Sequence, residues 1–287
     1  MSERIVYLNG NFLPVHEARI SVMDRGFLFG DGVYEVIPVY GGQPFRLIHH
    51  LQRLELSLQG IQLEPPLNPV QWQDILTNLI RHNGGGDQSL YLQITRGVAP
   101  SRDHGFPERV QPTVFAMSSP LEEPDAADRQ GIKAITLKDI RWQHCHIKAI
   151  TLLPNVLMHQ QALAAGATEA ILLRDGLATE GAASNLFIVQ NGVILTPPQS
   201  HLLLPGITRD LVMELCQQNS LPCREADISE AALHAADEIW ISNSVRELTA
   251  VIELDGKPIG EGKPGPYWQR ISALYADYKR TLHDKKD

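Results

Sequence analysis

Three dipeptides in this 287-residue chain, Asn9-Gly10, Asn191-Gly192 and Asp255-Gly256, each stand between two short runs of apolar residues. Asparagine or aspartate followed by glycine tolerates the positive φ angles that a tight two-residue turn requires. Each dipeptide therefore predicts a β-hairpin. The chain is thus expected to pair antiparallel strands near its start and again in its second half.

Segments with a helical apolar period alternate with further strand-like runs along the chain. This alternation predicts a fold of α/β (α+β) class. The expected helices are 47–58, 72–80, 156–165, 208–216 and 267–282, and the further expected strands are 33–40, 89–95, 113–117, 132–137, 170–173 and 238–242.

The segment 118–129 separates two parts of the chain. It is rich in proline, aspartate, glutamate and alanine and has no apolar period, which is typical of a linker. We therefore expect a small N-terminal α/β domain over residues 1–118, a linker over 119–128 and a larger C-terminal domain over 129–287.

Composition excludes several classes of partner. The net charge of −8 argues against nucleic-acid binding, and no apolar run approaches the ~18 residues of a membrane span. The chain opens without an apolar signal segment and has only three cysteines, so a cytoplasmic protein with reduced thiols is expected. His144, Cys145 and His146 could suggest a metal site, but three adjacent residues on a strand cannot all face one ion, so none is expected.

Lys148 differs from the other lysines because it stands in an apolar stretch, residues 145–153, with no nearby acid in sequence. Desolvation in such surroundings lowers the pKa of a lysine, which suits Schiff-base chemistry. A lysine that extends to solvent from a strand edge would have the same local sequence. Taken alone, the segment favours this second interpretation.

Two further segments could approach a ligand. Residues 179–187 combine small side chains with a carboxylate, Glu180, and an amide, Asn185. A turn that leads into a strand would have a similar sequence. Residues 204–210 place Gly206 before Ile-Thr at an expected helix start, where free N–H groups can cradle a phosphate. Taken alone, this segment is also consistent with an ordinary helix cap.

Together, these segments resemble the signature of class IV aminotransferases, which are fold-type IV enzymes that use pyridoxal 5'-phosphate. The order Glu180 to Phe187, then Ile194 to Thr196, then Leu204 to Arg209 carries the resemblance. It extends over nearly the whole chain and is strongest toward D-amino-acid aminotransferases, because Arg102-Asp103-His104 is similar to that family's Arg-x-His carboxylate trap. Further matching segments are 24–26, 29–35, 50–54, 141–142, and Ser244 with Glu247.

The resemblance implies a two-domain fold and a set of cofactor-binding residues. Lys148 would form the Schiff base with pyridoxal 5'-phosphate and act as the base for proton transfer. Glu180 would keep the pyridine nitrogen protonated, and Arg141 would lie near the cofactor or support Glu180. The phosphate would be held by Arg53, Ile207, Thr208 and Ser244.

The resemblance also implies how substrate binds. Tyr34 would approach the substrate from the small domain, while Arg102 and His104 would bind its α-carboxylate. In the family this pair comes from the neighbouring subunit, which implies a homodimer. Ser101 makes the loop that carries the pair one residue longer than the family's usual spacing.

The expected reaction is transamination of D-amino acids of the D-alanine or D-glutamate type, with a 2-oxo acid as acceptor. Three alternatives remain open: an aminodeoxychorismate lyase, a branched-chain L-amino-acid or (R)-amine aminotransferase, and a non-catalytic binding protein. Arg102 with His104 argues against the lyase, and a Phe-Glu-Gly-type segment would be expected at residues 33–35 of a branched-chain enzyme. Lys148 and Glu180 argue against a non-catalytic protein.

Overall fold

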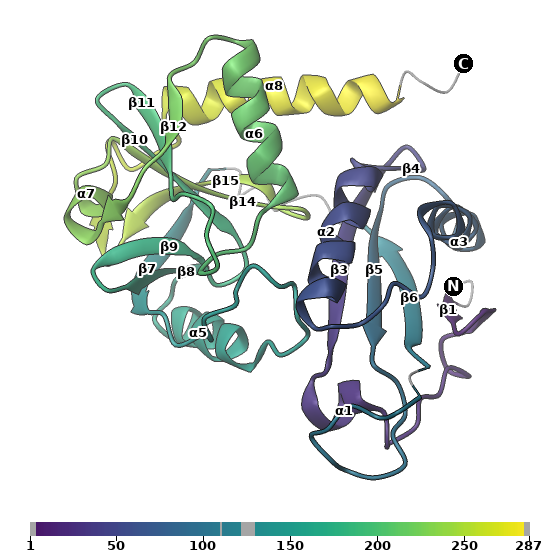
Figure 1. The fold of residues 1–287 in the computed structure, drawn as a ribbon. Coiled ribbons are helices and arrows are strands. Elements are labelled where there is room, and N and C mark those ends of the chain that lie inside the picture. Colours follow the sequence, from purple (N-terminus) through teal and green to yellow (C-terminus); the bar gives the residue numbers. More distant parts are fainter. Residues whose placement is uncertain (1–3, 110, 122–129, 284–287) are drawn as a thin grey trace. The chain divides into compact units, whose positions relative to one another are not determined.

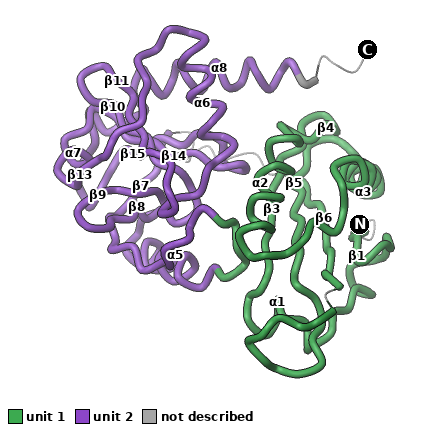
Figure 2. The backbone as a smooth tube through the Cα atoms, in the orientation of Figure 1, with its two compact units in different colours: residues 1–122, 147–151, 282–287 green, residues 123–146, 152–281 purple. Residues whose placement is uncertain are grey.

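The computed structural model describes residues 4–109, 111–121 and 130–283. The chain forms two compact units (Figure 2). The first contains Met1–Glu122, Ile147–Thr151 and Leu282–Asp287, and the second contains Glu123–His146 and Leu152–Thr281. The expected linker lies largely outside the described residues, so the domain boundaries stay a prediction.

Within the described residues of the first unit, six strands form one antiparallel sheet in the order β2-β1-β6-β5-β3-β4 (Figure 1). The hairpin expected at Asn9-Gly10 is confirmed, because these residues have φ angles of 49° and 96°. The strands are β1 (Ile5–Leu8), β2 (Asn11–Pro14), β3 (Gly32–Tyr40), β4 (Gln43–Pro44), β5 (Gln88–Thr95) and β6 (Thr113–Pro120).

Helices α2 (Leu47–Gly60) and α3 (Pro69–His82) pack their apolar faces with this sheet into one core. A third helix, α1 (Arg25–Phe29), begins where the Asp24 carboxylate accepts a hydrogen bond from the backbone N–H of Gly26 at 2.7 Å. The sequence did not predict α1, because five residues are too few to show an apolar period.

In the described part of the second unit, ten strands form a mixed sheet in the order β12-β11-β10-β14-β15-β7-β8-β9-β13, with β16 paired to β15. The pairs β11–β12, β15–β7 and β7–β8 are parallel, and the other pairs are antiparallel. The strands are β7 (Ile132–Lys138), β8 (Glu169–Arg174), β9 (Leu177–Gly181), β10 (Asn185–Gln190), β11 (Val193–Thr196), β12 (Cys223–Glu225), β13 (Ile228–Ser229), β14 (Glu238–Asn243), β15 (Glu247–Leu254) and β16 (Lys257–Pro258).

The helices of this part are α5 (Leu153–Ala164), α6 (Ile207–Gln218), α7 (Glu230–His234) and α8 (Pro266–His283). Phe187 and Trp240 are cross-strand neighbours on β10 and β14, and their rings stack with centroids 4.6 Å apart. The hairpins expected at Asn191-Gly192 and Asp255-Gly256 both form. The predicted α/β class is therefore confirmed.

No helix in the described part of the chain combines the length and the apolar character that crossing a bilayer requires. The cysteines Cys145, Cys216 and Cys223 are free thiols.

Gly97 occupies a position where a larger residue would clash with the backbone. Its φ angle is +84°, and a Cβ atom there would lie 1.9 Å from the carbonyl oxygen of Gln111. We expect Gly97→Ala to lower the free energy of unfolding by about 2–5 kcal/mol, from left-handed strain and overpacking combined. Urea denaturation measures this loss. Gly85→Ala is the control, since Gly85 also has positive φ but no atom within 4 Å of the added carbon; equal losses at both positions would contradict the steric argument.

Candidate active site

Lys148 lies in the short segment Ile147–Thr151 that belongs to the first unit. Its carbonyl oxygen accepts a hydrogen bond from Tyr34 N at 3.0 Å, and its own N–H donates to Ser57 Oγ at 3.1 Å. The next residue, Ala149, forms an antiparallel bridge with Val33 of β3. The backbone of Lys148 is therefore fixed between β3 and α2.

The side chain of Lys148 is half-buried, and its Nζ lies 4.2 Å from the centroid of the Tyr34 ring. An ammonium at this distance is attracted by the electron-rich face of an aromatic ring. The structure thus brings together two of the residues that the sequence singled out. Tyr91 also packs against Tyr34, with centroids 5.7 Å apart, and burial with the nearby Tyr34 raises the pKa of Tyr91 to about 12.

Arg53 is held by a buried carboxylate of the same unit. Its Nε and one terminal nitrogen donate to the two oxygens of Glu35, both at 2.8 Å, and His50 Nδ1 lies 2.8 Å from one of them. Burial alone would raise the pKa of Glu35, but Arg53 and His50 outweigh burial and hold that pKa well below its usual range. Burial lowers the pKa of His50. The sequence quoted Glu35 within a matching segment but did not predict that it binds Arg53.

Glu180 is the penultimate residue of strand β9 in the second unit and is 3% exposed. Arg141 donates to its Oε1, Asn185 Nδ2 donates to its Oε2 at 3.0 Å, and the backbone N–H of Leu204 lies 3.1 Å from the same oxygen. Burial raises the pKa of Glu180, and Arg141 offsets this only in part. Of the two positions expected for Arg141, the structure places it against Glu180.

Arg141 is itself held by Asp139, which the sequence did not identify. The Asp139 carboxylate accepts from Arg141 Nε at 3.0 Å and from a terminal nitrogen at 2.9 Å, and it also pairs with Arg174 at 3.1 Å. Burial lowers the pKa of Arg141, but Asp139 and Glu180 more than compensate and raise it. A lone aspartate after a strand has no local pattern that would have revealed this contact.

Ile207 and Thr208 are the first two residues of α6, as expected for a phosphate cradle. The preceding Gly206 provides no side-chain cap, so the first N–H groups of the helix stay open to a ligand. A Cβ at Gly206 would lie 1.8 Å from Asn185 Oδ1. Asn185 also donates to the Leu204 carbonyl at 2.8 Å, so it joins the Glu180 site to the loop before α6.

Ser244 is half-buried in the turn between β14 and β15. Helix α6 packs against β14. The nearby Ser242 is 1% exposed and pairs across the sheet with Asn185, yet its hydroxyl has no hydrogen-bond partner within the described residues. An unpartnered buried hydroxyl and an uncapped helix start are features that a bound phosphate group would satisfy.

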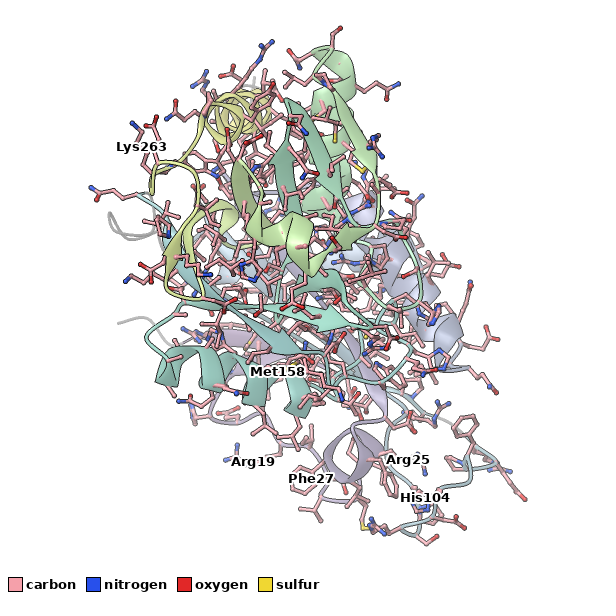
Figure 3. The ribbon with its side chains drawn as sticks, turned by 90° about the vertical axis from the view of Figure 1, so that its left-hand side faces the viewer. Arg19, Arg25, Phe27, His104, Met158 and Lys263 are labelled. Atoms are coloured by element: carbon pink, nitrogen blue, oxygen red, sulfur yellow. The ribbon has the colours of Figure 1, made fainter. Side chains whose placement is uncertain are left out.

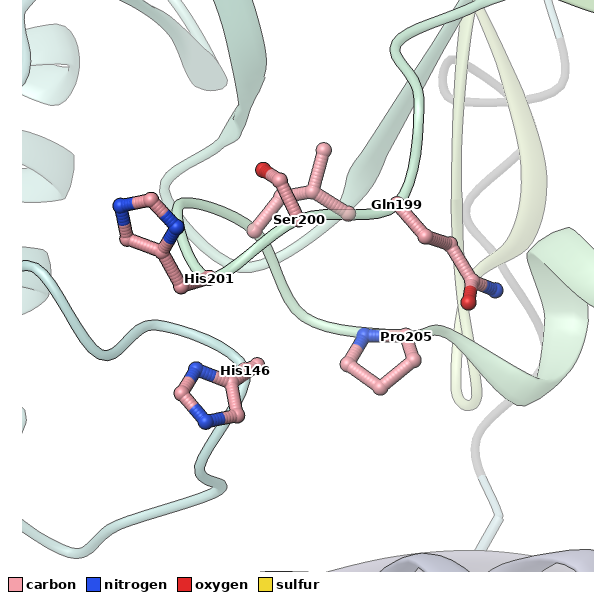
Figure 4. A pocket seen from close by; sticks show the side chains of 6 residues that line it. His146, Gln199, Ser200, His201 and Pro205 are labelled. Atoms are coloured by element: carbon pink, nitrogen blue, oxygen red, sulfur yellow. The ribbon is translucent and has the colours of Figure 1, made fainter.

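A cavity of about 370 Å³ lies beside the loop that leads into α6 (Figure 4). His146 and His201 border it from two segments of the second unit. Gln199, Ser200, Leu203 and Pro205 complete its lining. None of these six residues was among the predicted site residues.

Arg102 and His104 lie in the loop between β5 and β6 of the first unit, and both are exposed. The guanidinium of Arg102 lies 5.0 Å from the centroid of Phe29, and the His104 ring lies 5.2 Å from the same centroid. The structure therefore brings the two predicted trap residues together at one aromatic ring of α1. Ser101 precedes them, and its carbonyl accepts from Asp103 N at 3.1 Å.

Comparison with known proteins decides the family. The model of the amino-transferase class IV family matches residues 32–254.

The chain belongs to the class IV aminotransferase family.

A curated relative, D-alanine aminotransferase of Bacillus licheniformis, is 40% identical over 266 residues, which cover 93% of this chain and 94% of that protein. Among solved structures, the Escherichia coli branched-chain amino acid aminotransferase has a TM-score of 0.91 at 28% identity, covering 96% of this chain and 94% of that one. The branched-chain aminotransferase of the archaeon Thermoproteus uzoniensis, solved with norvaline, has a TM-score of 0.89 at 28% identity, covering 100% and 97%. The resemblance noted in the sequence is thereby confirmed.

The Glu35 site generates a prediction about acid stability. Because the folded pKa of Glu35 lies below its ordinary value of 4.5, its contribution to stability is present above pH 4.5 and is lost as the pH falls below it. We expect Glu35→Gln to cost about 3–5 kcal/mol at pH 7, since Arg53 loses a buried partner, and less as the pH falls toward 3.5.

Urea unfolding of both proteins between pH 7 and pH 3.5 measures this difference. Glu64→Gln, at an exposed position of the same unit, is the control and should cost little at any pH. A penalty for Glu35→Gln that is independent of pH would contradict the assigned ionisation.

Proposed function

We propose that this chain catalyses pyridoxal-phosphate-dependent transamination between D-amino acids of the D-alanine or D-glutamate type and a 2-oxo acid such as pyruvate or 2-oxoglutarate. The convergence of Arg102 and His104 on one ring carries the substrate assignment, because a guanidinium and an imidazole together suit the carboxylate of a small amino acid. The relative of 40% identity, named D-alanine aminotransferase, supports the same assignment. The branched-chain neighbours keep a branched-chain L-amino-acid substrate as the second candidate.

The residues of the chain fit the cofactor. Lys148 would attach it covalently, and the amides of Ile207 and Thr208, with the hydroxyl of Ser244 and the guanidinium of Arg53, would hold its phosphate. When bound, pyridoxal phosphate supplies an electron-withdrawing ring that stabilises negative charge at the α-carbon of the amino acid. The raised pKa of Glu180 supports this fit, since a protonated ring nitrogen beside it would supply the positive charge that Arg141 provides only in part.

The roles of the side chains follow from their chemistry. Lys148 Nζ would take the proton from the substrate α-carbon and deliver it to the cofactor carbon that carries the amino nitrogen. Glu180 would hold the proton of the ring nitrogen, and Tyr34 would orient Lys148 and the substrate from the first unit. Arg102 and His104 would bind the α-carboxylate.

The assembly completes the proposal. We propose a cytoplasmic homodimer in which each chain gives Arg102 and His104 to the other chain's cofactor site. We also retain the division into a small domain over residues 1–118, a linker over 119–128 and a cofactor-binding domain over 129–287. The partners are then small amino acids and 2-oxo acids.

The purified protein tests the activity directly. It should carry the visible absorption of a lysine-bound cofactor, and D-alanine alone should discharge that absorption while pyruvate forms. Lys148→Ala should lack the lysine-linked absorption and lower kcat by at least about 10²–10⁴-fold. If L-leucine discharges the absorption and D-alanine does not, the branched-chain candidate is favoured. If no absorption appears even after pyridoxal phosphate is added, the proposal that the protein is a pyridoxal-phosphate enzyme is refuted.

Mixing two variants that each lack a different residue of the shared site tests the exchange of residues between chains. Arg102→Ala keeps Lys148, and Lys148→Ala keeps Arg102, so a mixed dimer contains one complete site. Random pairing makes about half of the dimers mixed, so mixing should restore about a quarter of the wild-type sites. Light scattering gives the oligomeric state, each variant alone is the control, and no recovery in proven mixed dimers would contradict the exchange.

A further inference from the structure

Two buried arginines of the first unit share one carboxylate. Arg25 Nε and Arg96 Nε each donate to Asp31 Oδ2 at 2.8 Å. The two arginine residues are 3% and 2% exposed, so both guanidinium groups are held far from bulk water. One carboxylate orients both groups, which leaves their terminal nitrogens directed at other acceptors.

The terminal nitrogens of Arg25 bind the backbone of the loop that carries the trap. One donates to the carbonyl oxygens of Asp103 at 2.6 Å and Gly105 at 3.1 Å, and the other donates to that of His104 at 3.3 Å. Three consecutive carbonyls thus converge on one guanidinium. Figure 3 shows Arg25 and His104 at the same end of the first unit, close to Phe27 of α1.

The same helix turn also contacts the trap side chains. Phe29 lies four residues after Arg25, and the Arg25 guanidinium is 4.9 Å from its ring centroid. Arg102 and His104 approach that ring as well. Arg96, the first residue of the loop, places its guanidinium 3.7 Å from the centroid of Phe106. The Asp31 pair therefore holds the loop through its backbone at residues 103–105 and through an aromatic contact at residue 106.

We propose that Arg25 is a positioning residue for the substrate carboxylate: oriented by Asp31, it fixes residues 103–105 so that Arg102 and His104 are arranged before substrate arrives. The proposal rests on the proposed function, because it assumes that these two side chains bind the carboxylate. Arg25 acts through the loop backbone, so its loss weakens substrate binding and leaves the chemical step nearly unchanged.

The contacts of Arg25 also bear on the additional residue that the resemblance predicts at Ser101. The carbonyls of residues 103–105, which Arg25 binds, follow Ser101 in the chain. An additional residue at Ser101 therefore lengthens only the segment between Gly97 and Arg102. The position of His104 is set by Arg25 and is unaffected by that length.

Arg25→Lys tests the anchor, because lysine keeps the charge and can reach Asp31 but lacks the planar fork that reaches three carbonyls. We expect KM for D-alanine to rise about tenfold to a hundredfold, the scale of hydrogen bonds to a charged group, with kcat changed less than about threefold. Arg19→Lys is the matched control, since Arg19 is exposed and bonds the carbonyls of His16 and Ala18.

A double-mutant cycle separates positioning from general destabilisation. In a background that carries both Arg102→Ala and His104→Ala, Arg25→Lys should raise KM by less than about twofold further, because both groups that it positions are already gone. Equal factors in both backgrounds, or a fall in kcat without a rise in KM, would overturn the proposal. Asp31→Asn gives the second variant if Arg25→Lys does not fold, and it should raise KM in the same way.

Hydrogen exchange on the same variants measures the local stability of the loop and does not depend on enzymatic activity. The amides of residues 103–106 should exchange faster in Arg25→Lys than in the wild type, and at the wild-type rate in Arg19→Lys. The amides of β5 and β6 should keep their protection in both variants. Unchanged exchange at 103–106 would overturn the anchor. If the wild type transaminates no D-amino acid, the proposed function is refuted, and the substrate role of Arg102 and His104 with it. If the wild type is active but Arg25→Lys leaves KM unaltered, only the positioning role of Arg25 is refuted.

Discussion

A buried guanidinium requires a carboxylate beside it, and this constraint shapes the candidate site in both units. Removing an ion from water costs several kcal/mol, which only a well-placed opposite charge and further hydrogen bonds can offset. Arg53 has Glu35, Arg25 has Asp31, and Arg141 has Asp139. Each pair fixes the orientation of the arginine; Arg141 then binds Glu180, and Arg25 binds the carbonyls of the loop that carries Arg102 and His104.

Glu35 and Glu180 show how the same pairing gives opposite results. Both are buried against an arginine, yet the pKa of Glu35 is lowered and that of Glu180 is raised. Glu35 has two hydrogen bonds from Arg53 and a neighbouring histidine, whereas Glu180 shares Arg141 with Asp139. The partners of Glu35 thus outweigh the cost of burying its charge, whereas those of Glu180 offset that cost only in part. For Glu180, burial is the largest influence that raises the pKa, and the nearby Asp139 adds to it, while Arg141 opposes both.

Local patterns predicted most of the fold, since hairpin dipeptides and apolar periods depend only on near neighbours. They did not predict α1, α7 and the two-residue strand β13, which are too short to show a period. The site was predicted through motifs, so Lys148, Glu180 and Thr208 were named. Asp139 was missed because a lone aspartate after a strand has no local pattern. Arg25 was quoted only as part of a matching segment, because it reaches carbonyls 78 to 80 residues away, which no local pattern relates to it. The place of Lys148 beside β3 likewise depends on a pairing across the chain.

Specificity in such a fold must reside where the scaffold leaves freedom. Branched-chain aminotransferases share the fold of this chain, so under the proposed function the fold alone cannot choose the substrate. Under the proposed function, the loop between β5 and β6 is the candidate, because it presents two exposed side chains while its carbonyls bind a buried arginine. An exposed loop alone would lose conformational entropy when it binds a small ion, and that loss would cancel much of the contact energy. The hydrogen bonds from Arg25 to the carbonyls of residues 103–105 order the loop backbone before any ligand binds, which removes this cost in advance.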